Sequence, residues 1–281
     1  MSHAIVYSRA RVGMDAPPVN VEVHLSNGLP SLSMVGLPET AVKESKDRVR
    51  SAILNSQFDF PARRITINLA PADLPKEGGR FDLPIALGIL AASSQIPVTE
   101  LAQLEFAGEL ALSGELRGIQ GILPMMLQTH RAQRTLIIPA ENIAEALLVK
   151  DARVLAGDHL LEITGHLTGR RRLEYEAAVT PTVADMPFPD LADVRGQHHA
   201  RRALEIAAAG GHNLIMLGPP GTGKSLLANR LPGILPEMGD TEALEAATIA
   251  SISGKPVDTL YWKRPAFRSP HHTASAVALV G

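Results

Sequence analysis

One eight-residue pattern in the last third of the chain limits strongly what the surrounding sequence can fold into. The stretch from Gly218 to Ser225 matches the spacing G-x-x-x-x-G-K-[ST]. The apolar run at 213–217 before it predicts a short buried strand, and the residues at 226–231 after it predict a helix. A strand, a glycine-rich loop and a helix in this order are typical of P-loop α/β domains. The residues of the expected loop are Gly218, Pro219, Pro220, Gly221, Thr222, Gly223, Lys224 and Ser225.

The chemistry of this loop follows from its residue types. Glycines allow consecutive backbone N–H groups to converge on one anion, where a Cβ atom would obstruct them. The helix that follows presents its positive N-terminal end to the same phosphates. Lys224 adds a full charge that reaches the β- and γ-phosphates, and Ser225 supplies an oxygen to Mg²⁺. The pattern therefore predicts binding of ATP, ADP or a close relative together with Mg²⁺.

The chain is long enough for two domains, and its composition changes between them. It has 281 residues, whereas one domain typically has about 100–200. Toward the end of the first two thirds, apolar residues become sparse, and Pro181, Pro187 and Pro189 favour a semi-rigid linker. The predicted parts are a first domain at 1–167, a linker at 168–190 and a P-loop domain at 191–281.

The first domain shows alternating strand and helix patterns. Residues 19–25 carry an apolar side chain at every second position, which predicts a strand with one buried face, and 65–69 predicts another strand. A helix is expected to begin near Pro38, because proline loses nothing in the first turn of a helix. Asp82 is expected to be the N-cap of a second helix, whose residues 83–92 are apolar on every side and therefore buried. These patterns predict an α/β unit.

The composition excludes several classes of site. The chain has no cysteine, which excludes disulfides, thiol nucleophiles and cysteine-ligated zinc. Its net charge of −2 gives no overall attraction to nucleic acid or to an anionic membrane. The first residues lack the pattern of a signal peptide, and the longest apolar stretch, from Leu83 to Ala92, is too short to span a bilayer. We expect a cytoplasmic protein with no membrane partner.

The second domain resembles a known family over several motifs. The segments 193–197 and 203–213, together with the P-loop, resemble the AAA+ module of magnesium-chelatase-like proteins, in particular the bacterial ComM (YifB) subfamily. The segment 267–273 is similar to the stretch before the Walker B strand of that family. In AAA+ proteins the segment matching 194–197 lies over the adenine, so the resemblance implies an adenine contact for Val194. Ordinary packing at the start of a helix is the alternative for this residue.

The same resemblance implies where the rest of the ATPase machinery lies. In this family the Walker B carboxylates, the sensor residues and the arginine finger come after the position of Gly281. Residues 191–281 then correspond to a partial AAA+ module. We therefore expect the 281-residue chain to bind ATP and to hydrolyse little of it, because hydrolysis needs an acid that holds Mg²⁺ and an arginine that stabilises the transition state.

The first domain resembles the proteolytic domain of Lon-type proteases, an α/β fold of the ribosomal-protein type. The resemblance is carried by Phe106 to Leu116, Gly121, His130-Arg131 and Ile137 to Asn142. In Lon-type enzymes these landmarks bracket a Ser–Lys dyad, in which a desolvated lysine activates the serine. Here the lysine position falls on Met125 and the serine position on Arg80 or Asp82. The resemblance implies a protease fold without the catalytic dyad.

Together the two resemblances imply a function for the intact protein. They imply an ATP-driven ring, a homo-hexamer, that moves along forked or branched DNA and migrates branches during recombination of incoming strands in natural transformation. Three alternatives stay open. They are an ATPase subunit that inserts Mg²⁺ into a porphyrin, in which residues 1–167 would have no expected place, an ATP-dependent Lon-like protease, and a nucleotide-responsive scaffold.

Other signals have simpler explanations. Adjacent histidines, as in His198-His199 and His271-His272, point in different directions and form no chelating face, so we expect surface or packing roles. Tyr261 and Trp262 stand beside two cationic residues and could stack a base, but we prefer the end of a buried strand for them. The run Arg170 to Arg172 is expected to be a solvated surface near the linker.

Overall fold

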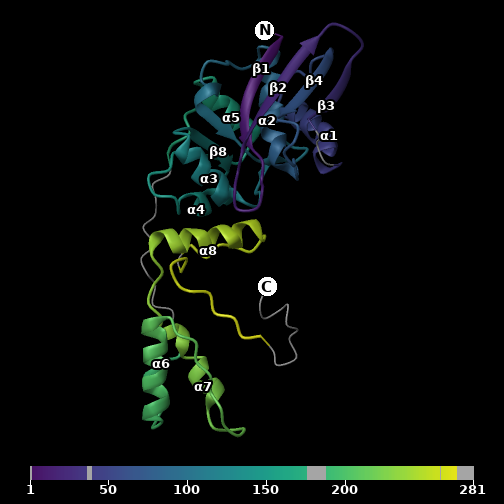
Figure 1. Cartoon of the computed structure of the whole chain (residues 1–281). Coiled ribbons are helices and arrows are strands. Elements are labelled where there is room, and N and C mark those ends of the chain that lie inside the picture. The colour runs from purple at the N-terminus through teal and green to yellow at the C-terminus, as the bar shows by residue number, and fades with distance from the viewer. Residues whose placement is uncertain (1, 37–39, 176–187, 260, 271–281) are drawn as a thin grey trace. The chain divides into compact units, whose positions relative to one another are not determined.

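The computed structural model of the chain describes residues 2–36, 40–175, 188–259 and 261–270 (Figure 1). Two compact units divide the chain. The first comprises Met1–Thr180 with Ala247–Thr259, and the second comprises Pro181–Ala246 with Leu260–Gly281. The change from one unit to the next at Thr180 lies inside the stretch 168–190. Within the described residues, no helix is both long enough and apolar enough to cross a bilayer.

A seven-stranded mixed sheet forms the centre of the first unit, as the α/β class predicted for it requires. Its strands are β1 (His3–Arg9), β2 (Pro18–Ser26), β3 (Ser31–Val35), β4 (Arg64–Ala70), β5 (Leu104–Phe106), β8 (Thr135–Pro139) and β9 (Val154–Gly157). Their order across the sheet is β3-β4-β2-β1-β5-β8-β9. The pairs β1–β2 and β2–β4 are antiparallel, whereas β3–β4, β1–β5, β5–β8 and β8–β9 are parallel.

The period-two patterns of the sequence correspond to the strands that pair most extensively. Val21 and Val23 of β2 are fully buried and lie opposite Leu69 and Ile67 of β4, which are also fully buried. Glu22, between the two valines, is only half-buried, because successive side chains of a strand point to opposite faces. The strands predicted at 19–25 and 65–69 are therefore confirmed.

Helices cover the sheet of the first unit. They are α1 (Thr40–Asn55), α2 (Asp82–Ala92), α3 (Ile122–Arg131), α4 (Ile143–Ala146) and α5 (Leu160–Leu167), and a short hairpin, β6 (Glu109–Leu110) with β7 (Leu116–Arg117), lies between them in sequence. Every residue of α2 is buried, as its apolar composition predicted, and α2 packs on β1 and β2. Gly88 permits this close approach, because a Cβ atom there would lie 2.6 Å from Cγ2 of Val23.

Asp82 differs from its predicted role as the N-cap of α2. The N-cap is Phe81, and Asp82 is the first helical residue. Its buried carboxylate accepts hydrogen bonds from Nε and Nη2 of Arg48, at 2.7 Å and 3.1 Å, and from the backbone N–H of Leu110 at 3.2 Å. A tertiary ion pair thus replaces the local cap. Burial raises the pKa of Asp82 to about 6, although the bond from Arg48 acts in the opposite direction.

This raised pKa predicts a change of stability with pH. Between about pH 4 and pH 6 the unfolded chain loses the Asp82 proton before the folded chain does, so the wild type loses stability as the pH rises through this window. An Asp82→Asn variant should lack this component, which amounts to at most about 3 kcal/mol at 1.36 kcal/mol per pKa unit. Urea unfolding of both proteins at pH 4 and pH 7 measures it. An equal pH dependence in the two proteins would contradict the assignment.

A buried ionic network joins the two halves of the sheet. Glu105 of β5 has no exposed surface, and its carboxylate accepts from Nε and Nη2 of Arg9, at 2.6 Å and 2.9 Å. It also accepts from the hydroxyl of Thr129 in α3 at 2.6 Å, and from Nη1 of Arg134 at 3.4 Å. Arg134 in turn lies over the ring of Tyr7, 4.1 Å from its centroid. One carboxylate therefore connects β1, β5, α3 and the start of β8.

Truncation of this carboxylate should destabilise the protein strongly. Glu105→Ala leaves the guanidinium of Arg9, whose side chain is 7% exposed, buried without its partner. We expect a loss of about 3–5 kcal/mol in the free energy of unfolding. Arg134→Gln is the matched control, because the Arg134 side chain is 27% exposed and should contribute about 1 kcal/mol or less. Chemical denaturation followed by circular dichroism compares the two, and similar losses would refute the central role of Glu105.

The second unit contains short helices around a small apolar cluster. Its helices are α6 (His198–Gly210), α7 (Lys224–Ala228) and the first part of α8 (Asp240–Ile252), with single 3₁₀ turns at Leu191–Asp193 and Leu231–Gly233. α6 begins at His198, directly after its N-cap Gln197. The helix predicted at 226–231 is displaced, because α7 begins at Lys224 and ends at Ala228. A 3₁₀ turn with Pro232 near its start, at Leu231–Gly233, follows α7 after Asn229 and Arg230.

The strand predicted at 213–217 is wrong. These residues have no regular secondary structure, and Ile215 and Leu217 are 81% and 87% exposed. A strand needs a second strand to accept and donate its ladder of hydrogen bonds. The described residues of this unit contain no strand that could pair with this segment.

Candidate nucleotide-binding site

The glycine-rich loop of the second unit has the backbone conformation that its sequence suggests. Gly221 and Gly223 have φ angles of +83° and +85°, in the left-handed region that glycine adopts without a steric penalty. Gly218 has no positive φ but lies close to Thr222, because a Cβ atom on it would be 3.1 Å from Oγ1 of that residue. The loop thus depends on glycine for conformation at two positions and for space at a third.

Lys224 lies across its own loop. Its Nζ donates to the backbone oxygens of Gly218 at 2.7 Å and Pro219 at 2.8 Å, and lies 3.4 Å from Oγ1 of Thr222. The Thr222 hydroxyl donates to the same Pro219 oxygen at 2.9 Å. An ammonium group has three N–H donors, which can bond any nearby oxygen. Phosphate oxygens can therefore take the place of these carbonyl oxygens. The predicted phosphate-binding lysine therefore points at the loop that would hold the phosphates.

Ser225 is the residue predicted to bind Mg²⁺. It follows Lys224 in the first turn of α7 and is exposed, whereas Lys224 is half-buried. A hydroxyl oxygen is a suitable ligand for this hard cation, which prefers oxygen donors and retains several waters. Ser225, Lys224 and the loop backbone therefore fit a nucleotide with its Mg²⁺ ion in chemical terms. The prediction for Ser225 rests on this fit.

The segment before α6 contacts the loop through Gln197. Nε2 of Gln197 donates to the backbone oxygen of Thr222 at 3.2 Å, and a Cβ atom on Gly223 would lie 3.1 Å from the same nitrogen. Gln197 itself has a left-handed backbone, with a φ angle of 50°. No motif of the sequence predicts this role of Gln197, although Gly196 immediately before it signals an unusual local backbone.

Val194 packs in the core of this unit. It is 2% exposed and belongs to one buried cluster with Leu191, Leu204 and Leu227, of which the last lies in α7. The cluster thereby fixes the segment before α6 against the helix that carries Lys224. The predicted adenine contact of Val194 stays a prediction, and its side chain contributes packing in this structure.

Arg230 is a second residue that sequence reasoning missed. Its Nε donates to the backbone oxygen of Asp190 at 3.1 Å, and its Nη1 donates to that of Leu226 in α7 at 2.9 Å. Nη2 lies 3.7 Å from the carboxylate of Asp193. One guanidinium thus joins the C-terminal end of α7 to the segment that enters this unit. No motif of the sequence identifies it.

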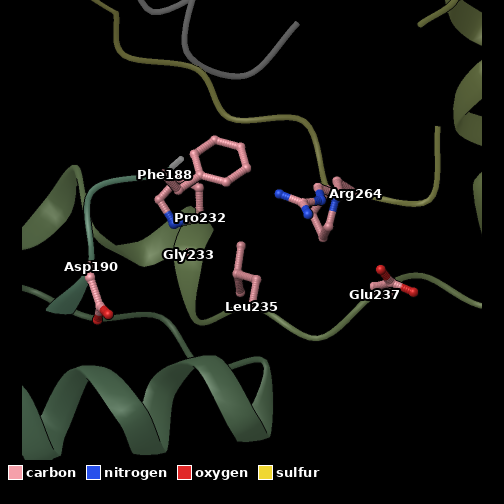
Figure 2. Close-up of a pocket in the computed structure, with 8 residues that line it drawn as sticks. Phe188, Asp190, Pro232, Gly233, Leu235, Glu237 and Arg264 are labelled. Carbon is pink, nitrogen blue, oxygen red and sulfur yellow. The ribbon is translucent and has the colours of Figure 1, made fainter. Parts of the chain in front are cut away.

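A pocket of about 330 Å³ lies in the same unit but does not involve the loop (Figure 2). It is lined by Phe188, Asp190, Pro232, Gly233, Leu235, Glu237, Arg264 and Pro265. The guanidinium of Arg264 lies 5.3 Å from the ring centroid of Phe188 and 5.2 Å from that of Tyr261. None of the residues 218–225 lines this pocket, so it is separate from the predicted phosphate site.

The predicted strand end at Tyr261 and Trp262 is wrong. These residues form a turn and are half-buried. Lys263 lies 5.5 Å from the ring centroid of Trp262 and bonds the carboxylate of Asp240 at 2.6 Å. The backbone N–H of Arg264 donates to the oxygen of Tyr261 at 2.8 Å, so a turn hydrogen bond and cation–ring contacts are found here in place of a strand ladder.

The other residues singled out in the sequence are the histidine pairs and the arginine run. His198 and His199 are exposed at the start of α6, and His271-His272 lie outside the described residues. Within the part that the structure describes, no three histidine, aspartate or glutamate side chains form a metal-binding group. Arg171 is exposed and pairs with Glu162 at 2.7 Å, as expected for a solvated run.

In the first unit, the positions that correspond to a Ser–Lys dyad are occupied by residues of other chemical types. Met125 is fully buried in α3, where a thioether can take up no proton. Arg80 is 5% exposed and donates from Nη2 to the backbone oxygen of Gln120 at 2.8 Å. Asp82 is held by Arg48. None of the three can act as a nucleophilic hydroxyl or as its amine base.

Comparisons with known proteins cover both units. Residues 21–142 match the family described as subunit ChlI of Mg-chelatase, and residues 190–281 match magnesium chelatase, subunit ChlI. The chain is 54% identical to the competence protein ComM of Haemophilus influenzae over 100% of its own length and 56% of that protein. It is 53% identical to YifB of Salmonella typhimurium and 50% identical to YifB of Escherichia coli, both over 100% of its length and 55% of theirs. The chain therefore spans a little over half the length of these relatives.

Proposed function

This chain belongs to the ComM/YifB group of magnesium-chelatase-like, AAA+-type ATPases, and from that premise we propose that residues 218–225 bind ATP or ADP with Mg²⁺. In this proposal the loop backbone and Lys224 hold the phosphates, Ser225 supplies one oxygen to Mg²⁺, and Val194 lies near the adenine. The observation that carries it is the position of Nζ of Lys224, 2.7 Å from the Gly218 oxygen at the mouth of the loop. Phosphate oxygens would replace the two carbonyls that it now contacts.

Removal of the lysine charge should weaken nucleotide binding. Charge-assisted hydrogen bonds contribute about 1.5–3 kcal/mol each, so Lys224→Ala should reduce the affinity for ATP about ten- to a hundredfold. Isothermal titration of the 281-residue chain measures this. Lys150→Ala, which removes an exposed lysine of the first unit, is the control and should bind as the wild type does. Equal affinities of the Lys224→Ala variant and the wild type would exclude this loop as the binding site.

Hydrolysis by the intact protein is a separate part of the proposal. The P-loop holds phosphates, whereas turnover also requires an acid for Mg²⁺, a group that orients water and an arginine that stabilises the transition state. The family resemblance implies that these groups follow the stretch that corresponds to residues 191–281. We infer that the 281 residues bind ATP with little turnover.

We further propose that the intact protein is a hexameric, ATP-driven motor that migrates branches in DNA during recombination of incoming strands. One relative is named as a competence protein, which supports a role in DNA uptake. The chain has a net charge of −2, so DNA contacts require local basic patches that a ring would gather. We propose Lys43, Lys46 and Arg50 of α1 as one such patch. Lys46 and Arg50 lie four residues apart on this helix, and the side chain of Lys43 is outside the described ones.

DNA binding by the intact protein should weaken as salt increases. Each phosphate that a lysine or arginine neutralises releases counterions, so the logarithm of the affinity should fall linearly with the logarithm of the salt concentration. Lys46→Ala with Arg50→Ala should reduce that slope by about 2, with Arg63→Ala as an exposed control. Fluorescence anisotropy with forked DNA measures it. Affinity that does not vary with salt, or no binding, would leave the motor function without support.

A chelatase subunit is a second candidate, and one observation favours it. The first domain was expected to have no counterpart in chelatase ATPase subunits, yet residues 21–142 match a family described as subunit ChlI. ATP hydrolysis stimulated by forked DNA, compared with Mg²⁺ insertion into a porphyrin, separates the two functions.

We also propose the Lon-like fold for residues 1–167. The residues at the dyad positions argue against a protease. In a nucleotide-responsive scaffold this domain would only bind partners.

A further inference from the structure

A buried guanidinium in the first unit has a nitrogen without a partner. Arg80 is 5% exposed, and its Nη2 donates to the backbone oxygen of Gln120 at 2.8 Å. Its Nη1 is buried and makes no hydrogen bond to any residue that the structure describes. Buried polar groups nearly always have a partner, and a guanidinium carries five donors that favour carboxylate and phosphate oxygens. The unpaired Nη1 therefore indicates an acceptor that the described residues do not supply.

A second arginine lies beside it. Arg11 donates from Nη2 to Glu77 at 2.8 Å and from Nη1 to the backbone oxygen of Ile252 at 3.3 Å, both within the first unit. Burial lowers the pKa of Arg80 to about 10, and the positive charge of Arg11 lowers it further in the same direction. Arg80 therefore stays charged at neutral pH. Two guanidiniums and the one carboxylate that bonds Arg11 give the group a formal net charge of about +1.

Gly121 allows the two arginines to approach the same stretch of backbone closely. Gly121 has a φ angle of +74°, and a Cβ atom there would lie 3.2 Å from Cδ of Arg11 and 3.7 Å from Nη2 of Arg80. Gly121 is also the N-cap of α3, so the positive end of this ten-residue helix faces the same place. Glu145 is an acid that would repel an anion at this place. Its carboxylate accepts from the backbone N–H of Leu123, in the first turn of α3, at 3.1 Å. Burial raises the pKa of Glu145 from its ordinary value.

We propose that a phosphate-type oxyanion binds between Arg80 and Arg11 and displaces the carboxylate of Glu77. The anion would accept from Nη1 of Arg80 and from Nη2 of Arg11. Glu77 can leave at low cost because its side chain is 39% exposed, whereas Arg11 is 27% exposed and stays at the rim. The burial of Arg80 favours a small ion or a terminal phosphate over a phosphodiester, which carries a nucleoside on either side. This site belongs to the first unit, and its existence does not depend on the nucleotide site.

Titration with inorganic phosphate tests the proposal. All proteins carry Lys224→Ala, so that the P-loop contributes little to the heat, and ionic strength is held constant with chloride. The parent should bind phosphate with a saturable isotherm. Arg80→Gln should weaken binding about ten- to a hundredfold, and Glu77→Gln should strengthen it, because it removes the competing carboxylate. Arg63→Gln, which removes an exposed arginine, should leave it unchanged.

The opposite responses of the two variants separate binding from a folding defect. A misfolded Arg80→Gln protein would bind weakly for trivial reasons, and its circular dichroism reveals this, but misfolding cannot explain tighter binding by Glu77→Gln. A non-saturable response, or equal affinity of the parent and Glu77→Gln, would overturn the proposal. A parallel titration with a short DNA strand tests the source of the phosphate. Competition by DNA but not by inorganic phosphate would overturn the assignment to a small anion.

Discussion

The first unit depends on one buried carboxylate at the weakest point of its sheet. The antiparallel strands β2 and β1 meet the parallel strands β5, β8 and β9 where β1 pairs β5, and that pairing involves one residue pair, Tyr7 with Glu105. Elsewhere a ladder of hydrogen bonds holds neighbouring strands together. Here Glu105 bonds Arg9 of β1 across the junction and receives the Thr129 hydroxyl from α3. Because the junction lies in the middle of the sheet, both halves rely on the same ion pair.

The difference between local signals and contacts of distant residues explains which features could be predicted from the sequence. The alternation in β2 and the apolar composition of α2 are local signals, because burial on one face or on every face determines the residue types directly. Asp82 could not be assigned in this way, since its choice between a cap and an ion pair depends on Arg48, 34 residues earlier in the chain. The strand prediction at 213–217 was wrong for a related reason. An apolar pattern is local, whereas a strand also needs a pairing strand, which depends on residues far away in the chain.

The candidate nucleotide site shows a similar division. The motif residues from Gly218 to Ser225 could be located from spacing alone, because a phosphate-binding loop requires glycines and a lysine at fixed intervals. The supporting residues could not. Gln197 and Arg230 act through backbone oxygens, which every residue carries, so no sequence pattern marks their contacts with Thr222, Asp190 and Leu226. Supporting residues of this kind become visible only when distant segments have been brought together.

The contacts of Lys224 with its own loop give the site a built-in competitor. An anion that binds Nζ must replace the hydrogen bonds to the oxygens of Gly218 and Pro219, which belong to the same loop. A weakly charged anion gains little from this exchange, whereas a polyphosphate offers several oxygens of higher charge to the same ammonium. If the loop binds nucleotide as proposed, these contacts would set a minimum charge density for its ligands, and selection among phosphorylated molecules would begin before the base or the sugar is contacted.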